Sequence, residues 1–137
     1  MKIAICGSMT LAQKMLEAER ELRARGHKVI LPEFVQEYAA LENAEERHSE
    51  SARNKVQSDL IRRYYQKIME SDAVLVVNGE RHGIQNYIGG NAFLEMGFAH
   101  VLVKGIYLLN PVPEMIYTDE IKAMQPIVIN GDYDLVE

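Results

Sequence analysis

The chain is poor in the residues on which several classes of protein depend. It contains one cysteine, Cys6, and no tryptophan. A single cysteine excludes an intrachain disulfide and argues against a cysteine-based zinc cluster. The four histidines show no metal-ligand spacing of the H-x-x-x-H kind, so the sequence predicts no metal site.

Long hydrophobic runs and an excess of basic charge are also missing. No segment reaches the length needed to cross a bilayer, and the apolar run at the amino terminus is too short for a signal peptide. The formal net charge is −5 and the pI is about 5.4, which argues against a nucleic-acid-binding surface. We therefore expect a cytoplasmic protein with no nucleic-acid partner and no membrane partner.

What is present has the composition of one globular domain. Hydrophobic residues make up 47% of the chain and charged residues 26%, which are ordinary proportions for a soluble protein. A chain of 137 residues can bury a substantial core. No internal repeat or low-complexity linker divides it, so we expect a single domain over residues 1–137.

Apolar runs alternate with helical periodicities along the chain. Short apolar runs predict five strands, at residues 2–6, 27–31, 73–77, 106–109 and 126–130. Apolar residues at helical spacing predict helices at residues 10–25, 54–71, 91–103 and 114–124. Residues 33–53 interleave acidic and basic side chains, and either a helix or a mobile excursion fits them.

Strands that alternate with helices predict an α/β fold with three layers and a parallel sheet. Five strands fit a flavodoxin-like or Rossmann-like sheet with the order 2-1-3-4-5. Ligands of such sheets bind at the carboxyl ends of the first and third strands, where the winding reverses. Gly7, Ser8 and Met9 follow the first strand, and Asn78 and Gly79 follow the third. We expect both turns to face one crevice.

Glu95 is the most informative residue because its surroundings are so apolar. In the helix predicted at 91–103, only Asn91, Glu95 and His100 are strongly polar, and a helix of that kind is usually buried. A buried carboxylate without a partner is costly. Glu95 is therefore a candidate functional group, although an ion pair inside the fold or a place on an exposed stripe would also explain it.

Other polar residues near the predicted crevice allow two interpretations each. Asn91 shares a helix face with Glu95, and it could cap the helix or hold a ligand hydroxyl. Ser8 and Thr10 could help free backbone amides to bind an anion, or they could simply cap the first helix. His82 lies in the loop after the third strand, where it could contact a base or merely be exposed.

Two motifs resemble the nucleoside 2-deoxyribosyltransferase family, which includes the related deoxynucleoside 5′-monophosphate N-glycosidases. The first is Cys6-Gly7-Ser8-Met9. The second is Gly90-Asn91-Ala92-Phe93-Leu94-Glu95-Met96-Gly97-Phe98-Ala99. The order of elements agrees along nearly the whole chain. An aspartate that the family commonly carries ahead of the third strand corresponds by position to Tyr64.

The resemblance and the expected crevice together suggest a role for each candidate residue. Glu95 would be the catalytic nucleophile that attacks the anomeric carbon of a nucleoside sugar. The expected substrate-binding residues are Gly7, Ser8, Met9, Asn78, Gly79, Gly90, Asn91, Asp72, Tyr64 and Thr118. No cofactor and no metal would be needed, and the partner would be a small-molecule nucleoside or nucleotide. A homo-oligomer is expected, at least a dimer, in which Tyr117 and Thr118 of a neighbouring chain help to close the site.

Three functional interpretations remain open at this point. The first is an enzyme that cleaves or transfers the N-glycosidic bond of a (deoxy)nucleoside or its 5′-monophosphate. The second is a non-catalytic nucleotide-binding or sensing module, in which Glu95 only grips ribose hydroxyls. The third, FMN binding, fits less well because the phosphate loop lacks a Ser/Thr-rich run and the chain has no tryptophan to stack on a flavin.

Overall fold

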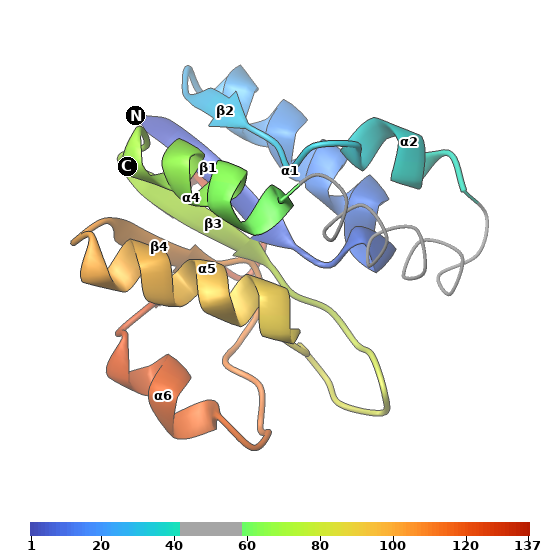
Figure 1. Ribbon diagram of the computed structural model, residues 1–137, viewed down its shortest axis with the longest axis vertical. Helices are drawn as coiled ribbons and strands as arrows, with labels where there is room; N and C mark the ends of the chain where they lie inside the picture. Colours follow the sequence, from blue (N-terminus) through green and yellow to red (C-terminus); the bar gives the residue numbers. More distant parts are fainter. Residues whose placement is uncertain (42–58) are drawn as a thin grey trace.

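Five parallel strands form the centre of the computed structural model, which describes residues 1–41 and 59–137 (Figure 1). The strands are β1 (Lys2–Gly7), β2 (Lys28–Ile30), β3 (Ala73–Val77), β4 (Gly105–Leu108) and β5 (Ile127–Val128). Their order is β2-β1-β3-β4-β5, and every neighbouring pair is parallel. The flavodoxin-like order expected from the sequence is therefore confirmed.

Helices cover both faces of this sheet. One face carries α1 (Ala12–Ala24) and α2 (Val35–Ala39), and the other carries α4 (Leu60–Met69), α5 (Gly90–Val101) and α6 (Thr118–Ala123) (Figure 1). Two short 3₁₀ helices, η1 (Met9–Leu11) and η2 (Tyr133–Leu135), complete the described elements. None of the helices in the described ranges has both the length and the apolar character that a membrane crossing requires.

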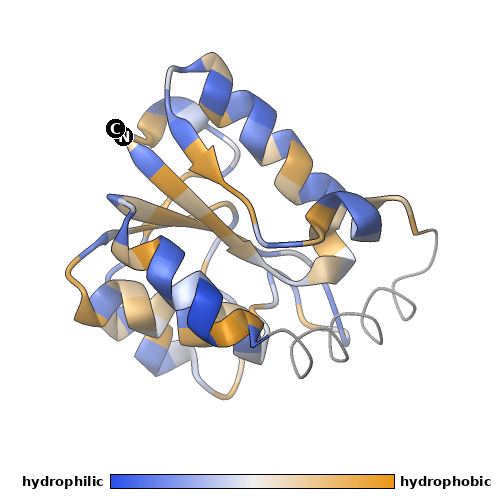
Figure 2. Cartoon of the chain, turned by 45° about the horizontal axis from the view of Figure 1, so that its top comes forward, coloured by the Kyte–Doolittle hydropathy of each residue, from blue (hydrophilic) through white to orange (hydrophobic). Residues whose placement is uncertain are grey.

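The strands supply apolar side chains to two separate cores. In β1, Ile3 and Ile5 pack into the core beneath α1, while Ala4 and Cys6 pack into the core beneath α5. This alternation follows from the two-residue period of a strand. Because both faces are covered, the central strands are apolar over most of their length (Figure 2). The result is the three-layer arrangement expected from the sequence.

Helix boundaries differ from the sequence prediction where local backbone geometry intervenes. The first helix begins at Ala12 because Ser8 caps the 3₁₀ turn η1, with its Oγ accepting from the Thr10 amide at 3.2 Å. Helix α5 ends at Val101, two residues early, and Val103 adopts a left-handed φ of 58°. Helix α6 is shorter than the predicted 114–124, and η2 was not predicted.

Part of the sequence prediction falls outside the described residues. The helix expected at 54–71 is seen from Leu60 to Met69 as α4. The segment expected to be a helix or an excursion, 33–53, is described only as far as residue 41, and it contains α2. Residues 42–58 lie outside the structural description.

Candidate active site

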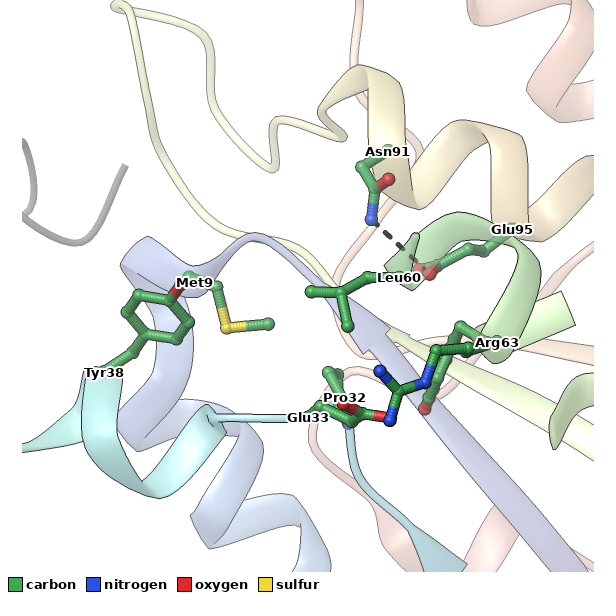
Figure 3. A pocket seen from close by; sticks show the side chains of 9 residues that line it. Met9, Pro32, Glu33, Tyr38, Leu60, Arg63, Asn91 and Glu95 are labelled. Carbon is green, nitrogen blue, oxygen red and sulfur yellow. Dashed lines mark hydrogen bonds and ion pairs between the residues drawn. The ribbon is translucent and has the colours of Figure 1, made fainter. Parts of the chain in front are cut away.

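Glu95 lies in the second turn of α5 with its side chain turned into the protein. It is only 6% exposed, in a helix whose other buried residues are apolar. One turn earlier, the Asn91 side chain donates from Nδ2 to Glu95 Oε2 at 3.4 Å (Figure 3). Helix α5 begins at Gly90 with Gly89 as its N-cap, so the capping role considered for Asn91 is wrong. Its amide faces the carboxylate instead.

Cys6 and Tyr64 lie in the core close to Glu95. The Cys6 thiol is fully buried, and burial, the charge of Glu95 and a hydrogen bond to Glu95 raise the pKa of this thiol. The thiol therefore keeps its proton at neutral pH and donates a hydrogen bond to the carboxylate. The sequence alone did not reveal this contact, because Cys6 is on a strand and Glu95 is on a helix that covers it.

Tyr64 supports the site from below without directing its hydroxyl at Glu95. Burial, followed by the charges of Cys6 and Glu95, raises the pKa of the phenol, so it remains a hydrogen-bond donor. The hydroxyl donates to the Ile5 carbonyl and lies 3.3 Å from the Ile30 carbonyl. Tyr64 therefore ties β1 to β2 beneath the site and contributes to its wall.

Glu95 lines an open pocket between α2, α4 and α5. The pocket has a largely apolar wall and a polar wall, which Figure 3 shows from close by. The residues that line it are Met9, Pro32, Glu33, Tyr38, Leu60, Arg63, Tyr64, Asn91 and Glu95. On the polar wall, Arg63 Nη2 lies 2.8 Å from Glu33 Oε1. This pocket is called the Glu95 pocket below.

A second pocket adjoins the first, and both are lined by Met9 and Asn91. Its remaining lining residues are Gly7, Ser8, Arg81, His82, Tyr87, Gly89, Gly90 and Ala92. It contains the start of α5, where no side chain caps the first backbone amides. Free amides at a helix start and a nearby guanidinium both favour an anion. We call this the Ser8 pocket.

Gly7 is required by its close contacts at the base of the Ser8 pocket. A Cβ atom at this position would lie 3.0 Å from the Val77 carbonyl oxygen and 3.2 Å from the Met15 sulfur. The first of these neighbours is backbone of an adjacent strand and cannot move aside cheaply. Glycine therefore lets β1, β3 and α1 meet closely where the first strand ends.

The rim of the Ser8 pocket is formed by a loop whose residues the sequence analysis only partly identified. His82 lies edge-on against Tyr87, with ring centroids 5.4 Å apart, and Arg81 Nε donates to His82 Nε2 at 3.2 Å. An isolated bridge between Arg81 and Ile84 folds the loop back on itself. Arg81 and Tyr87 were missed because only this turn brings them to the site.

Asn78 and Gly79 lie at the carboxyl end of β3, beside the crevice. The buried Asn78 amide donates to the carbonyl oxygens of Asn86, Asn110 and Pro111, and its Oδ1 accepts from the Asn110 amide. Asn78 thus fixes the two loops that follow β3 and β4. Gly79 packs against Leu11. Gly79 lines a small hollow next to the Ser8 pocket together with Ser8 and Arg81, as expected for two turns that face one crevice. Contact of Asn78 and Gly79 with a substrate stays a prediction.

Asp72 and Thr118 also lie apart from the two pockets. Asp72 precedes β3, and its Oδ2 accepts from the Lys2 amide at 2.8 Å. This places Asp72 at the amino ends of the strands, opposite the crevice, so the prediction that it binds substrate is corrected. Thr118 Oγ1 accepts a hydrogen bond from the Met115 amide and lies within donating distance of the Pro113 and Met115 carbonyls, so it stabilises the turn before α6. A contribution from Thr118 to a neighbouring subunit stays a prediction.

Two adjoining pockets thus offer different chemistry to a ligand. The Glu95 pocket combines a carboxylate with an apolar wall, while the Ser8 pocket presents amides, hydroxyls and Arg81. Within the described parts of the chain, no group of three or more histidine, cysteine or acidic side chains is placed to hold a metal ion. The arrangement suits an elongated ligand with an anionic end and a reactive centre beside Glu95.

Comparison with known proteins gives one structural likeness. No protein-family model matches the chain, and no curated protein matches it. Among solved structures, it is similar to a 2-deoxyribosyltransferase from the psychrotolerant bacterium Bacillus psychrosaccharolyticus. The identity is 17%, the TM-score is 0.47, and the superposition covers 93% of this chain and 98% of that chain.

Proposed function

We propose that the protein cleaves or transfers the N-glycosidic bond of a (deoxy)nucleoside or a nucleoside 5′-monophosphate, with Glu95 as the nucleophile. The observation that carries this proposal is a buried carboxylate at the wall of a pocket, held by Asn91 and Cys6. The adjoining Ser8 pocket, which suits an anion, supports a substrate with a phosphate at one end. The two sequence motifs that resemble the deoxyribosyltransferase family point to the same chemistry.

The two pockets suggest how such a substrate would lie. Met9 and Asn91 line both, so the sugar would lie at their shared boundary with its anomeric carbon beside Glu95. Its 5′ end would then reach Gly7, Ser8 and the start of α5. The base, attached to the anomeric carbon, would occupy the Glu95 pocket.

The reaction would proceed by two displacements at the anomeric carbon. A Glu95 oxygen forms a bond to that carbon while the bond to the base nitrogen breaks, and the bonding electron pair leaves with the base. The base then takes up a proton. Water opens the glycosyl ester in hydrolysis, supplying a hydroxyl to the sugar and, in the net reaction, the proton to the base. In transfer, the nitrogen of a second base replaces water, and in either case the carboxylate is restored.

A panel of nucleosides and 5′-monophosphates tests this proposal directly. We expect chromatography to detect free base from at least one of them. Glu95→Gln preserves the shape of the side chain and removes its negative charge, so turnover should fall by several decades, about a thousandfold or more. Thermal unfolding should show that the variant remains folded.

The matched control is Glu120→Gln, which makes the same change at an exposed position of α6. It should leave turnover unaltered. Turnover of Glu95→Gln within about threefold of the wild-type value would contradict the assignment of Glu95 as the nucleophile.

A non-catalytic nucleotide-binding module is the second candidate. One observation favours it: Tyr64 stands where the family commonly has an aspartate, and its hydroxyl is occupied by the Ile5 carbonyl. Tyr64 is therefore poorly placed to give a proton to a leaving base. Calorimetry that shows tight nucleotide binding, together with no release of base from any substrate, would support this second function.

A further inference from the structure

The polar wall of the Glu95 pocket carries a hydrogen-bond acceptor, Glu33, that has no part in the proposed reaction. Glu33 follows β2 and Arg63 comes from α4, and both line the pocket that contains Glu95 (Figure 3). Arg63 lies 2.8 Å and Lys67 4.0 Å from the carboxylate of Glu33, and both reach the same oxygen, Oε1. Among residues 1–41 and 59–137, no hydrogen bond to the second oxygen, Oε2, is present, and the nearest approach of each cation is to Oε1.

The two members of this ion pair differ in their freedom to move. The side chain of Glu33 is 21% exposed, whereas that of Arg63 is 54% exposed. A half-buried carboxylate with one oxygen anchored has few alternative positions. It therefore presents Oε2 as a fixed acceptor, while Arg63 supplies N–H donors beside it.

The remaining wall of the pocket suits a flat ring. Met9, Pro32, Tyr38 and Leu60 offer apolar surface, which is the usual lining of a site for an aromatic ligand. In the proposed function, the base of the substrate occupies this pocket because its glycosidic bond lies beside Glu95. The polar edge of that base would then meet Glu33 and Arg63.

We infer that Glu33 makes the protein select nucleobases that carry an amino group next to an unprotonated ring nitrogen, as cytosine and adenine do. This inference rests on the proposed function. The amino group donates a hydrogen bond to Glu33 Oε2, and the neighbouring ring nitrogen accepts one from the Arg63 guanidinium. Cytosine and adenine share this donor–acceptor edge although their rings differ in size.

Bases with an oxo group at the same position fit this wall poorly. An ionised carboxylate only accepts hydrogen bonds, so an oxo oxygen in place of the amino group would face it without a proton between them. Uracil could donate its ring N–H to the carboxylate only by shifting along the wall, and that shift would move its anomeric carbon away from Glu95. One charge-assisted hydrogen bond of this kind corresponds to about tenfold discrimination or more.

Matched pairs of substrates test the inference. We would measure kcat/KM for the 2′-deoxynucleoside 5′-monophosphates of cytosine against uracil and of adenine against hypoxanthine. The wild-type protein should favour the amino member of each pair by about tenfold or more. Glu33→Gln should bring both ratios to within about threefold of unity, because a glutamine amide can donate to an oxo group as well as accept from an amino group.

The control variant is Glu37→Gln, which removes the same charge from an exposed position of α2 outside the Glu95 pocket. It should keep the wild-type ratios. A wild-type protein that favours the oxo bases or does not discriminate would overturn the inference, and so would ratios that Glu33→Gln leaves unchanged.

If Glu33→Gln does not fold, Glu33→Asp replaces it. This variant keeps the charge but withdraws the acceptor by one methylene, so it should lower kcat/KM for the amino bases more than for the oxo bases, and an equal loss would overturn the inference.

The design separates failure of this inference from failure of the proposed function. Release of base with ratios that do not depend on Glu33 would leave the proposed function intact and overturn the selection by Glu33. If no base is released, the same four nucleotides are compared by their dissociation constants in calorimetry, with the same expected ratios. Absence of binding by all four would overturn the inference together with the proposed function.

Discussion

Single side chains in this protein serve the fold and the site together, and Ser8 illustrates this most clearly. Its Oγ accepts from the Thr10 amide at 3.2 Å and lies 2.9 Å from Thr10 Oγ1. The capping interpretation is therefore correct for η1. The same residue also lines the Ser8 pocket next to Arg81. A hydroxyl that caps a helical turn keeps acceptor and donor capacity for a ligand, so the two roles are compatible.

Substitution of Ser8 separates these roles. Ser8→Ala should lower kcat/KM for a deoxynucleoside 5′-monophosphate by about tenfold, because one hydrogen bond to the phosphate is lost. The value for the unphosphorylated nucleoside should change much less. The loss of the cap should also lower the free energy of unfolding by about 1 kcal/mol.

The measurement is the ratio of kcat/KM for the phosphorylated and unphosphorylated forms of one nucleoside. Denaturant unfolding of the same variant gives the cost to stability. A clear wild-type preference for unphosphorylated nucleosides would remove the phosphate role of Ser8, though not a role beside the sugar.

At the level of helices and strands, the parts that the sequence predicts best are those with the strongest local signal. The predicted strand at 73–77 coincides with β3 because all five of its residues are buried on both faces of the sheet. The start of α1 and the end of α5 depend on a 3₁₀ turn at Met9 and on a left-handed Val103. Neither feature leaves a mark in the pattern of apolar residues.

The candidate site divides in the same way. Glu95, Asn91, Ser8 and Met9 come together as expected, because strand order and helix spacing determine where they lie. The ion pair between Glu33 and Arg63 was not foreseen. It joins an irregular segment after β2 to a helix, and only tertiary packing brings such residues into contact.

Asp72 could have been placed correctly from the sequence. In a parallel sheet, a residue that precedes a strand lies at the edge opposite the carboxyl ends, where ligands bind. Asp72 precedes the strand that was predicted at 73–77. A structural role at the start of that strand is therefore the simpler interpretation of Asp72.

The ends of β3 and β4 are joined by Asn78 and Asn110, and this connection can be tested by its effect on stability. The Asn110 side chain donates to the Asn78 carbonyl at 2.6 Å, while Asn78 Oδ1 accepts from the Asn110 amide at 2.9 Å. Asn78→Ala would leave several partly buried backbone groups without partners. We expect the free energy of unfolding to fall by about 2–3 kcal/mol.

Denaturant unfolding of Asn78→Ala measures this loss. Gln85→Ala is the control, because Gln85 is an exposed residue of the loop that Asn78 supports; it should change stability by less than about 0.5 kcal/mol. Equal effects of the two substitutions would contradict the bracing role of Asn78.

The outer sides of α4 and α5 are the part of the molecule that bears on its association with other copies. Four large apolar side chains of these helices are substantially exposed: Ile61, Met69, Leu94 and Val101. Between the helices, Tyr65 packs edge-on against Phe98 with ring centroids 5.1 Å apart. Tyr64, which neighbours Tyr65 in α4, is buried within its own chain. The prediction of an oligomer therefore depends on the four exposed residues and Tyr65.

We expect the protein to form at least a homodimer at micromolar concentration. Tyrosine and apolar side chains are enriched at such interfaces, and a symmetric pair would cover this surface on both subunits. Light scattering should give a mass of at least two chains, and Leu94→Glu should shift it toward one chain. A wild-type mass of one chain with activity retained would refute a site shared between subunits.

The rate at which reagents modify Cys6 can measure how often the core beneath Glu95 opens. Cys6 is the chain's single thiol, it is fully buried, and it is hydrogen-bonded to the carboxylate proposed to perform the reaction. Alkylating and disulfide reagents attack the thiolate, and burial together with the raised pKa keeps the thiolate scarce in the closed protein. The rate at which Cys6 is modified should therefore report how often the core beneath Glu95 opens to solvent. A nucleotide bound above that carboxylate should slow the modification, and a rate that bound nucleotide leaves unchanged would show that the ligand lies elsewhere.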